Sequence, residues 1–166
     1  MSDSPIYVTP RDVEKERKIA LALSKLTGQT FKRYEKETAP LDLWSEDFEG
    51  NITGKYEFKA RKYTSTSFRT LYVSERKYKA LMDTVERLNI PAYFIAQYLD
   101  WVRWVKVTDM EIVEWRMTGR TDRPEACNDI EKMALVTVRC MEDILRVDDG
   151  ELIQTRGESR YVQTRS

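Results

Sequence analysis

The chain has 166 residues, 28 acidic and 28 basic, and is 41% hydrophobic with nine Tyr, five Phe and four Trp. This length and aromatic content indicate one folded domain rather than a disordered chain. The sequence contains no histidine, which excludes Ser-His-Asp and Cys-His hydrolases and histidine-ligated metal sites, and it has no Gly-rich phosphate-binding loop.

The first part of the chain predicts a helix followed by strands. Pro10, after the cap candidate Thr9, fits the first position of a helix that should end at Gly28. Tyr56 and Phe58 alternate with Glu57 and Lys59, which predicts a half-buried strand. A polar turn at 45–54 should precede that strand. The strands expected in this part are at residues 29–34, 41–44 and 55–61.

The second part predicts a second helix and further strands. Ser74 is the expected cap of the helix, which should end near Pro91. Beyond Asp109 the signals are weaker. The order of helix, strands, helix and strand predicts an α/β or α+β layer fold with a central mixed sheet. The other expected segments are strands at 71–73, 92–99, 101–107 and 111–117, loops at 64–67 and 119–129, and a mixed helical turn and strand at 130–138.

This organisation predicts a single domain over residues 1–149, with a core at 10–107 and a C-terminal β/α extension at 108–149. Residues 150–166 are expected to form a polar tail. No apolar run approaches the ~18 residues of a membrane span, and no secretory signal pattern is present. Cys127 and Cys140 form no CxxC pair. We therefore expect an intracellular protein that does not bind membranes.

Three side chains form the central chemical pattern. Asp42 is followed fifteen residues later by Glu57-Phe58-Lys59. In a strand, Glu57 and Lys59 share one face and Phe58 points to the other. Two carboxylates with the backbone carbonyl of Phe58 give the oxygen ligand set that Mg²⁺ or Mn²⁺ prefers. Lys59 would then stand beside the metal, where it could orient the attacking water or neutralise charge on a phosphate.

The pattern Asp42…Glu57-Phe58-Lys59 resembles the PD-(D/E)XK nuclease superfamily, whose core runs helix, three strands, helix, strand. The resemblance covers residues 12–99 and implies a restriction-endonuclease-like fold, similar to small phage nucleases and Holliday-junction resolvases. Pro40 stands two positions before Asp42 rather than one, so the "PD" pair is not literal. Members often carry a glutamate on the first helix near the metals. Glu16 fits that role because it lies on the stripe of Ile19 and Leu23.

Each of these residues also has an ordinary structural explanation. Glu57 and Lys59 could form a surface ion pair on an exposed strand. Asp42 could be a turn carboxylate, and Glu16 could pair with a basic residue of its own helix. These alternatives remain open at the level of sequence.

Basic residues are concentrated where a phosphate-binding surface would be expected. The stretch from Lys55 to Lys79 holds eight basic and two acidic residues, whereas the stretch from Arg11 to Glu49 holds eight basic and nine acidic ones. A clustered positive charge favours contact with phosphates, although a solvated surface explains such a run as well. The candidate DNA contacts are Arg61, Lys62, Arg69 and Lys77, with Arg120 and Arg123 in the charged loop.

Together, the pattern and the resemblance predict a metal-dependent DNA nuclease that uses one or two Mg²⁺ or Mn²⁺ ions. We expect it to be structure-selective or non-specific, and to act in the cytoplasm of a bacterium or a phage-infected host cell. The resemblance leaves a homodimer open, with the aromatic-rich region after Leu99 as the candidate interface. The alternative is a non-catalytic protein on the same fold that binds nucleic acid or inhibits a host enzyme.

Overall fold

The computed structural model describes residues 10–36, 38–119 and 130–155. Its helices are α1 (Pro10–Thr27) and α2 (Glu75–Leu88), with the short 3₁₀ helices η1 (Val107–Asp109) and η3 (Val138–Cys140). Its strands are β1 (Thr30–Arg33), β2 (Leu43–Glu46), β3 (Ile52–Ala60), β4 (Thr70–Ser74), β5 (Ala92–Gln97), β6 (Trp101–Lys106), β7 (Ile112–Gly119), β8 (Ile130–Thr137), β9 (Glu142–Asp148) and β10 (Glu151–Ile153).

The described strands form two sheets. The larger has seven strands in the order β1-β2-β3-β5-β6-β9-β10, and the smaller has the order β4-β8-β7. Among the described strands, β3 and β5 alone pair in parallel, because α2 returns the chain to the same end of the sheet before β5 begins. The larger sheet is therefore mixed, as the sequence predicted.

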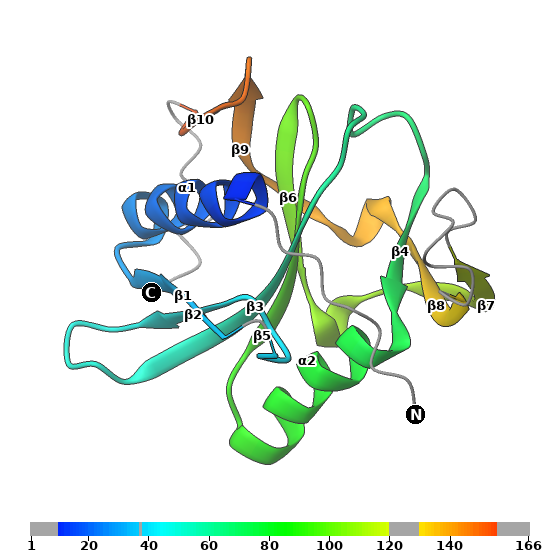
Figure 1. The fold of residues 1–166 in the computed structure, drawn as a ribbon, viewed down its shortest axis with the longest axis horizontal. Coiled ribbons are helices and arrows are strands. Elements are labelled where there is room, and N and C mark those ends of the chain that lie inside the picture. Colours follow the sequence, from blue (N-terminus) through cyan, green and yellow to red (C-terminus); the bar gives the residue numbers. More distant parts are fainter. Residues whose placement is uncertain (1–9, 37, 120–129, 156–166) are drawn as a thin grey trace.

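Helix α1 covers one face of the larger sheet, whereas α2 and the smaller sheet lie on its other side (Figure 1). Ile19 and Leu23 of α1 pack against Tyr56, Phe58 and neighbouring side chains of the sheet. The second core lies under α2. It joins the helix to β5 and to the smaller sheet through Leu81, Phe94, Val73, Ala134 and Val136, among others. Strand β3 thus has a core on each face and a strand on each side.

The ends of α2 explain why the chain turns there. Ser74 is extended, and its hydroxyl accepts a hydrogen bond from the backbone N–H of Lys77, which caps the first turn. Asn89 adopts the left-handed conformation (φ 54°) that ends many helices. Both boundaries agree with the sequence prediction, and the cap fixes which residues of the first turn face β3.

Several predicted boundaries differ from the structure. Strands β2 and β3 reach into the expected 45–54 turn, so the turn itself is short, and Asp47 closes it by accepting hydrogen bonds from the backbones of Glu49 and Asn51. The described part of the C-terminal extension contains strands and 3₁₀ turns without an α-helix. Residues 151–153, expected in a polar tail, pair with β9 as β10. Of the described helices, none is long and apolar enough to cross a bilayer.

Candidate active site

Glu57 places a carboxyl group in the interior of the larger sheet. Its side chain is 1% exposed, whereas Lys59 on the same face of β3 is 48% exposed. The strand alternates as predicted at Tyr56, Phe58 and Lys59, but Glu57 is buried because α2 packs over its part of this face. A surface ion pair is therefore excluded for Glu57. Burying a carboxylate is costly, and such groups are kept where they bind or react.

Asp42 lies next to Glu57 just before β2, and backbone pairing fixes its position. Its N–H donates to the carbonyl of Tyr56 (3.0 Å), and its own carbonyl accepts from the N–H of Tyr34 (2.9 Å). Its carboxylate Oδ2 accepts a hydrogen bond from the backbone N–H of Phe58 at 2.9 Å. Strand β2 begins at Leu43, one residue after Asp42. The carboxylate is thus held against the peptide that joins Glu57 to Phe58.

The carbonyl of Phe58 points towards the same edge as the Asp42 carboxylate. Backbone groups of alternate residues face the same neighbouring strand. The carbonyl of Tyr56 and the N–H of Phe58 both meet Asp42, so the carbonyl of Phe58 also faces this side. Residues 57, 59 and 61 face β5 instead, as the bond from the Arg61 N–H to the Gln97 carbonyl shows. Two carboxylates and one carbonyl therefore converge at the start of β2.

Two lysines flank the Glu57 carboxylate. Lys59 Nζ lies 3.7 Å from Oε2, and its side chain is 48% exposed. Lys77 Nζ lies 3.2 Å from Oε1 and donates to the carbonyl of Pro40 at 2.8 Å; its side chain is 14% exposed. The ammonium group of Lys77 forms an ion pair with the buried Oε1, and no other described residue donates to that oxygen. A carboxylate oxygen has two lone pairs, so Oε1 keeps capacity for a second ligand.

The electrostatics follow from this arrangement. Burial and, to a smaller extent, the negative charge of Asp42 raise the pKa of Glu57, Lys77 and Lys59 offset part of the increase, and the net value is about 8. Two carboxylates that share a site disfavour each other's charged form, and a nearby cation relieves that repulsion. The pair is therefore suited to binding added positive charge.

Glu16 of α1 lies near Asp42 but has its own partner. Its Oε1 accepts a hydrogen bond from Arg33 Nε on β1 at 2.6 Å, so the ion pair joins two elements rather than two turns of one helix. Burial raises the pKa of Glu16, the charge of Asp42 raises it further, and Arg33 opposes the shift. The effect of Asp42 on both glutamates places its carboxylate within electrostatic range of each.

A divalent cation fits this donor set. Mg²⁺ binds through one or two carboxylates and keeps several water ligands. Asp42, Glu57 and the Phe58 carbonyl supply such a set, and the buried Glu57 Oε1 keeps capacity for a second ligand. Within the part of the chain that is described, no three His, Cys, Asp or Glu side chains form a ready-made metal cluster. A complete cage of protein side chains is therefore absent from those residues.

Comparison with known proteins gives the family and the fold of the chain. The family model described as "Phage putative PDDEXK endonuclease" matches residues 3–144. The chain belongs to this endonuclease family. Among solved structures, the chain is similar to the 1.6 Å structure of Archaeoglobus fulgidus Hjc, a Holliday junction resolvase from an archaeal hyperthermophile. The TM-score is 0.54 and the identity is 19%, over 81% of this chain and 92% of that chain. The likeness shows a shared restriction-endonuclease-like fold. No curated protein matches the sequence.

The DNA contacts expected from the sequence fall into four groups. Lys62 and Arg69 are exposed in the loop between β3 and β4. Arg61 is half-buried and donates to the carbonyl of Tyr72 on β4 at 3.3 Å. Lys77 differs from the expectation, because its ammonium group is turned towards Glu57 and away from the surface. Two further candidates, Arg120 and Arg123, lie outside the described residues.

Lys77 is the site residue whose place the sequence analysis missed. The Ser74 cap was predicted, and it puts Lys77 in the first turn of α2. Nothing in the local sequence shows that this turn packs over β3, because that contact depends on the return of the chain through α2 to β5.

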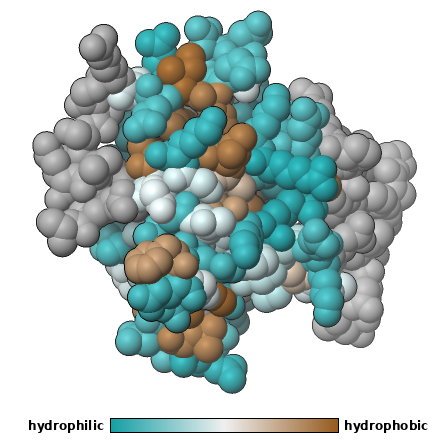
Figure 2. Space-filling model, turned by 90° about the vertical axis from the view of Figure 1, so that its left-hand side faces the viewer, coloured by the Kyte–Doolittle hydropathy of each residue, from teal (hydrophilic) through white to brown (hydrophobic). Residues whose placement is uncertain are grey.

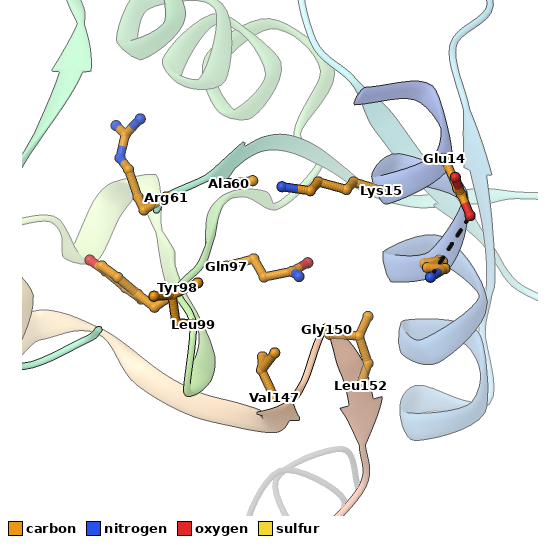
Figure 3. Close-up of a pocket in the computed structure, with 11 residues that line it drawn as sticks. Glu14, Lys15, Ala60, Arg61, Gln97, Tyr98, Leu99, Val147, Gly150 and Leu152 are labelled. Carbon is orange, nitrogen blue, oxygen red and sulfur yellow. Dashed lines mark ion pairs between the residues drawn. The ribbon is translucent and has the colours of Figure 1, made fainter. Parts of the chain in front are cut away.

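A separate pocket of about 260 Å³ lies between α1, the ends of β3 and β5, and the β9–β10 hairpin (Figure 3). In Figure 3, Lys15 and Gln97 point towards this space from opposite sides. Gln97 Oε1 is buried and has no hydrogen bond from the described residues. Gln97 pairs with Ala60, whose side chain packs with the α1 core, so the pocket is on the opposite face of the sheet from Glu57 and Lys59. It is not the carboxylate site.

Proposed function

We propose that this endonuclease hydrolyses DNA phosphodiester bonds with one or two Mg²⁺ or Mn²⁺ ions, held by Asp42, Glu57 and the Phe58 carbonyl. The observation that carries the proposal is the buried Glu57 carboxylate beside Asp42, with Lys59 close to Oε2 and with Lys77 as the contact of Oε1 among the described residues. Membership of the endonuclease family supports cleavage as the outcome.

A bound divalent cation would supply a water of lowered pKa and would neutralise charge on the phosphate. The protein's own contribution is placement. The backbone bonds of Asp42 and the central position of β3 fix the two carboxylates before the substrate arrives. Lys77, on α2, holds Glu57 in place through the ion pair with Oε1. Such preorganisation reduces the reorganisation needed during the reaction.

Lys59 is the proposed group that acts directly on the substrate. Its ammonium group contacts Glu57, yet about half of its side chain is exposed, so it can reach both the carboxylate and an incoming phosphate. There it would orient the attacking water or stabilise negative charge as the bond breaks. Glu16 is proposed to complete a second ion site, directly or through water, with Arg33 holding it in place.

DNA is the proposed substrate, held mainly through its phosphates. Lys62 and Arg69 are exposed in the loop that follows β3, and Arg61 lies at the base of that loop. Phosphate contacts do not read the base sequence, so DNA binding should be structure-selective or non-specific. The affinity should fall steeply as the salt concentration rises. Hjc, which shares the fold, is a Holliday junction resolvase.

We further propose a homodimer and a cytoplasmic place of action. Trp104, in the region expected to form the interface, is buried in the core, and Trp101 is half-buried. The exposed apolar residues of the smaller sheet are better interface candidates, and a group of this kind commonly marks a contact surface. The phage origin in the family description supports the cytoplasm of an infected bacterium. Sedimentation of the protein would test the assembly. The exposed apolar residues of the smaller sheet are Val113, Trp115, Met117 and Ile130.

The experiment that tests the function is cleavage of linear, circular, branched and single-stranded DNA, with Mg²⁺ or Mn²⁺ and with EDTA. The wild-type protein should cut at least one substrate only when the ion is present. Glu57→Gln and Lys59→Ala should abolish cleavage, whereas Lys106→Ala, which removes an exposed lysine on β6, should not. Full activity of Lys59→Ala would overturn the proposed role of Lys59. DNA binding without cleavage in every condition would instead support the non-catalytic alternative.

A further inference from the structure

The loop between β3 and β4, residues 61–69, carries an exposed aromatic ring that packs on more deeply buried rings. Phe68 is 57% exposed, and its ring packs edge-on against Tyr63, with centroids 4.8 Å apart and an interplanar angle of 80°. The ring of Tyr63 lies 5.8 Å from that of Tyr98, which is 3% exposed. Phe68 is therefore the outermost of three rings that begin in the core.

The loop beneath Phe68 is held by several hydrogen bonds. Ser65, 3% exposed, donates from its backbone and its hydroxyl to the two carboxylate oxygens of Asp100, at 2.8 and 2.9 Å. Arg103 donates to the carbonyl of Ser65, and the N–H of Leu99 donates to the carbonyl of Tyr63. Burial opposes the charge of Asp100, but the bonds from Ser65 outweigh it and lower its pKa. The loop is thus clamped to the turn between β5 and β6.

The same loop carries two exposed cations. Arg69 follows Phe68 in the sequence and Lys62 precedes Tyr63, and the carbonyl of Arg69 accepts from the N–H of Val138, which fixes the far end of the loop. The loop directly follows the strand that carries Glu57 and Lys59. An exposed ring in a loop with two cations matches the chemistry of a nucleic-acid strand, in which flat bases alternate with phosphates.

We propose that this loop is a platform for an unpaired DNA base, with Phe68 stacking on the base and Lys62 and Arg69 contacting the adjacent phosphates. The proposal rests on DNA being the substrate, and it refines that substrate to DNA with unpaired bases, such as single strands or branch points. Stacking requires a free face of the base, which a base inside a duplex does not offer. A ring held in place before binding loses little freedom on contact.

Phe48 provides a matched comparison. It is 96% exposed in the short turn between β2 and β3, and its neighbours in the sequence are the acidic residues Asp47 and Glu49. No ring contact of the kind made by Phe68 is found for Phe48 in the described part of the chain. Phe68 differs from Phe48 as a stacking candidate in its anchored ring contacts and in the cations of its loop. Exposure alone does not make this distinction.

The test is binding of the full chain, in EDTA so that no cleavage occurs, to a single-stranded oligonucleotide containing 2-aminopurine and to the same sequence in a duplex. Stacking quenches the fluorescence of 2-aminopurine. Phe68→Ala should weaken binding of the single strand about tenfold or more, abolish the quenching at saturation, and change duplex binding much less. Phe68→Tyr, which keeps an aromatic face, should behave like the wild type, and so should Phe48→Ala.

The outcomes separate this proposal from the proposed function. Equal loss of single-strand and duplex binding in Phe68→Ala, or no loss at all, would overturn the platform while leaving hydrolysis in place. Binding of neither DNA by the wild type would overturn the platform, and the cleavage assay with Mg²⁺ or Mn²⁺ would decide the proposed function separately. A selective loss with Phe68→Ala that Phe68→Tyr restores would support the platform even if no cleavage were detected. Circular dichroism of each variant confirms that it is folded.

Discussion

Replacement of Glu57 by Gln should change how the stability of the protein depends on pH. In the metal-free folded protein, burial and the charge of Asp42 raise the pKa of Glu57 from 4.5 to about 8. In the unfolded chain the group returns to its ordinary value. Between these two values the folded state binds a proton that the unfolded state releases, so this contribution to stability falls as the pH rises. Gln has the same shape and cannot titrate.

The magnitude follows from linkage. One proton bound in the folded state alone changes the free energy of unfolding by about 1.4 kcal/mol for each pH unit. The stabilisation from Glu57 is fully present below pH 4.5 and is lost as the pH rises through about 8. The free energy of unfolding of the wild type, minus that of Glu57→Gln, should therefore fall by roughly 4 kcal/mol between pH 5 and 8.

Urea unfolding at unit steps of pH from 5 to 9, in EDTA, measures this difference. Glu86→Gln, on the exposed side of α2, shows how much arises from removing a surface charge. A wild-type minus Glu57→Gln difference that stays constant over this range would refute the reasoning, because it would mean that Glu57 is charged in the folded protein throughout. Saturating Mn²⁺ should flatten the slope for the wild type only, since the ion takes the place of the proton.

Three further predictions concern the core, the second helix and the DNA surface. Leu23→Ala, at a fully buried position of α1, should lower the free energy of unfolding by about 2–5 kcal/mol in urea, and a loss below about 1 kcal/mol would contradict the packing described. Ser74→Ala removes the cap on the Lys77 N–H and should cost about 1 kcal/mol in thermal unfolding, whereas an unchanged melting temperature would argue against the cap. Lys62→Ala should reduce the slope of log affinity for DNA against log salt by about 1, and an unaltered slope would exclude Lys62 as a phosphate contact.

The sequence was most informative where local chemistry decides the structure. The cap at Ser74, the end of α1 before Gly28 and the alternation around Phe58 each predicted an element that the structure contains. These signals depend on residues a few positions apart. The resemblance to the PD-(D/E)XK superfamily was confirmed by the family match.

The sequence was least informative about contacts between distant segments. The strand at β4 was predicted, but its membership of a second sheet depends on β8, more than fifty residues later. Strand β9 was not predicted, because its buried residues Ile144, Leu145 and Val147 do not alternate strictly with polar ones. The burial of Glu57 was missed for the same reason, since it arises when α2 packs over β3.

The convergence of Asp42 and Glu57 on one divalent cation is tested most directly by calorimetric titration of Mn²⁺ into the wild type and Asp42→Asn above pH 8, with Lys106→Ala as the control. We expect the wild type and the control to bind Mn²⁺ with equal affinity, and Asp42→Asn to bind it roughly tenfold more weakly or worse. Equal affinity in all three proteins would contradict a shared ion at these carboxylates.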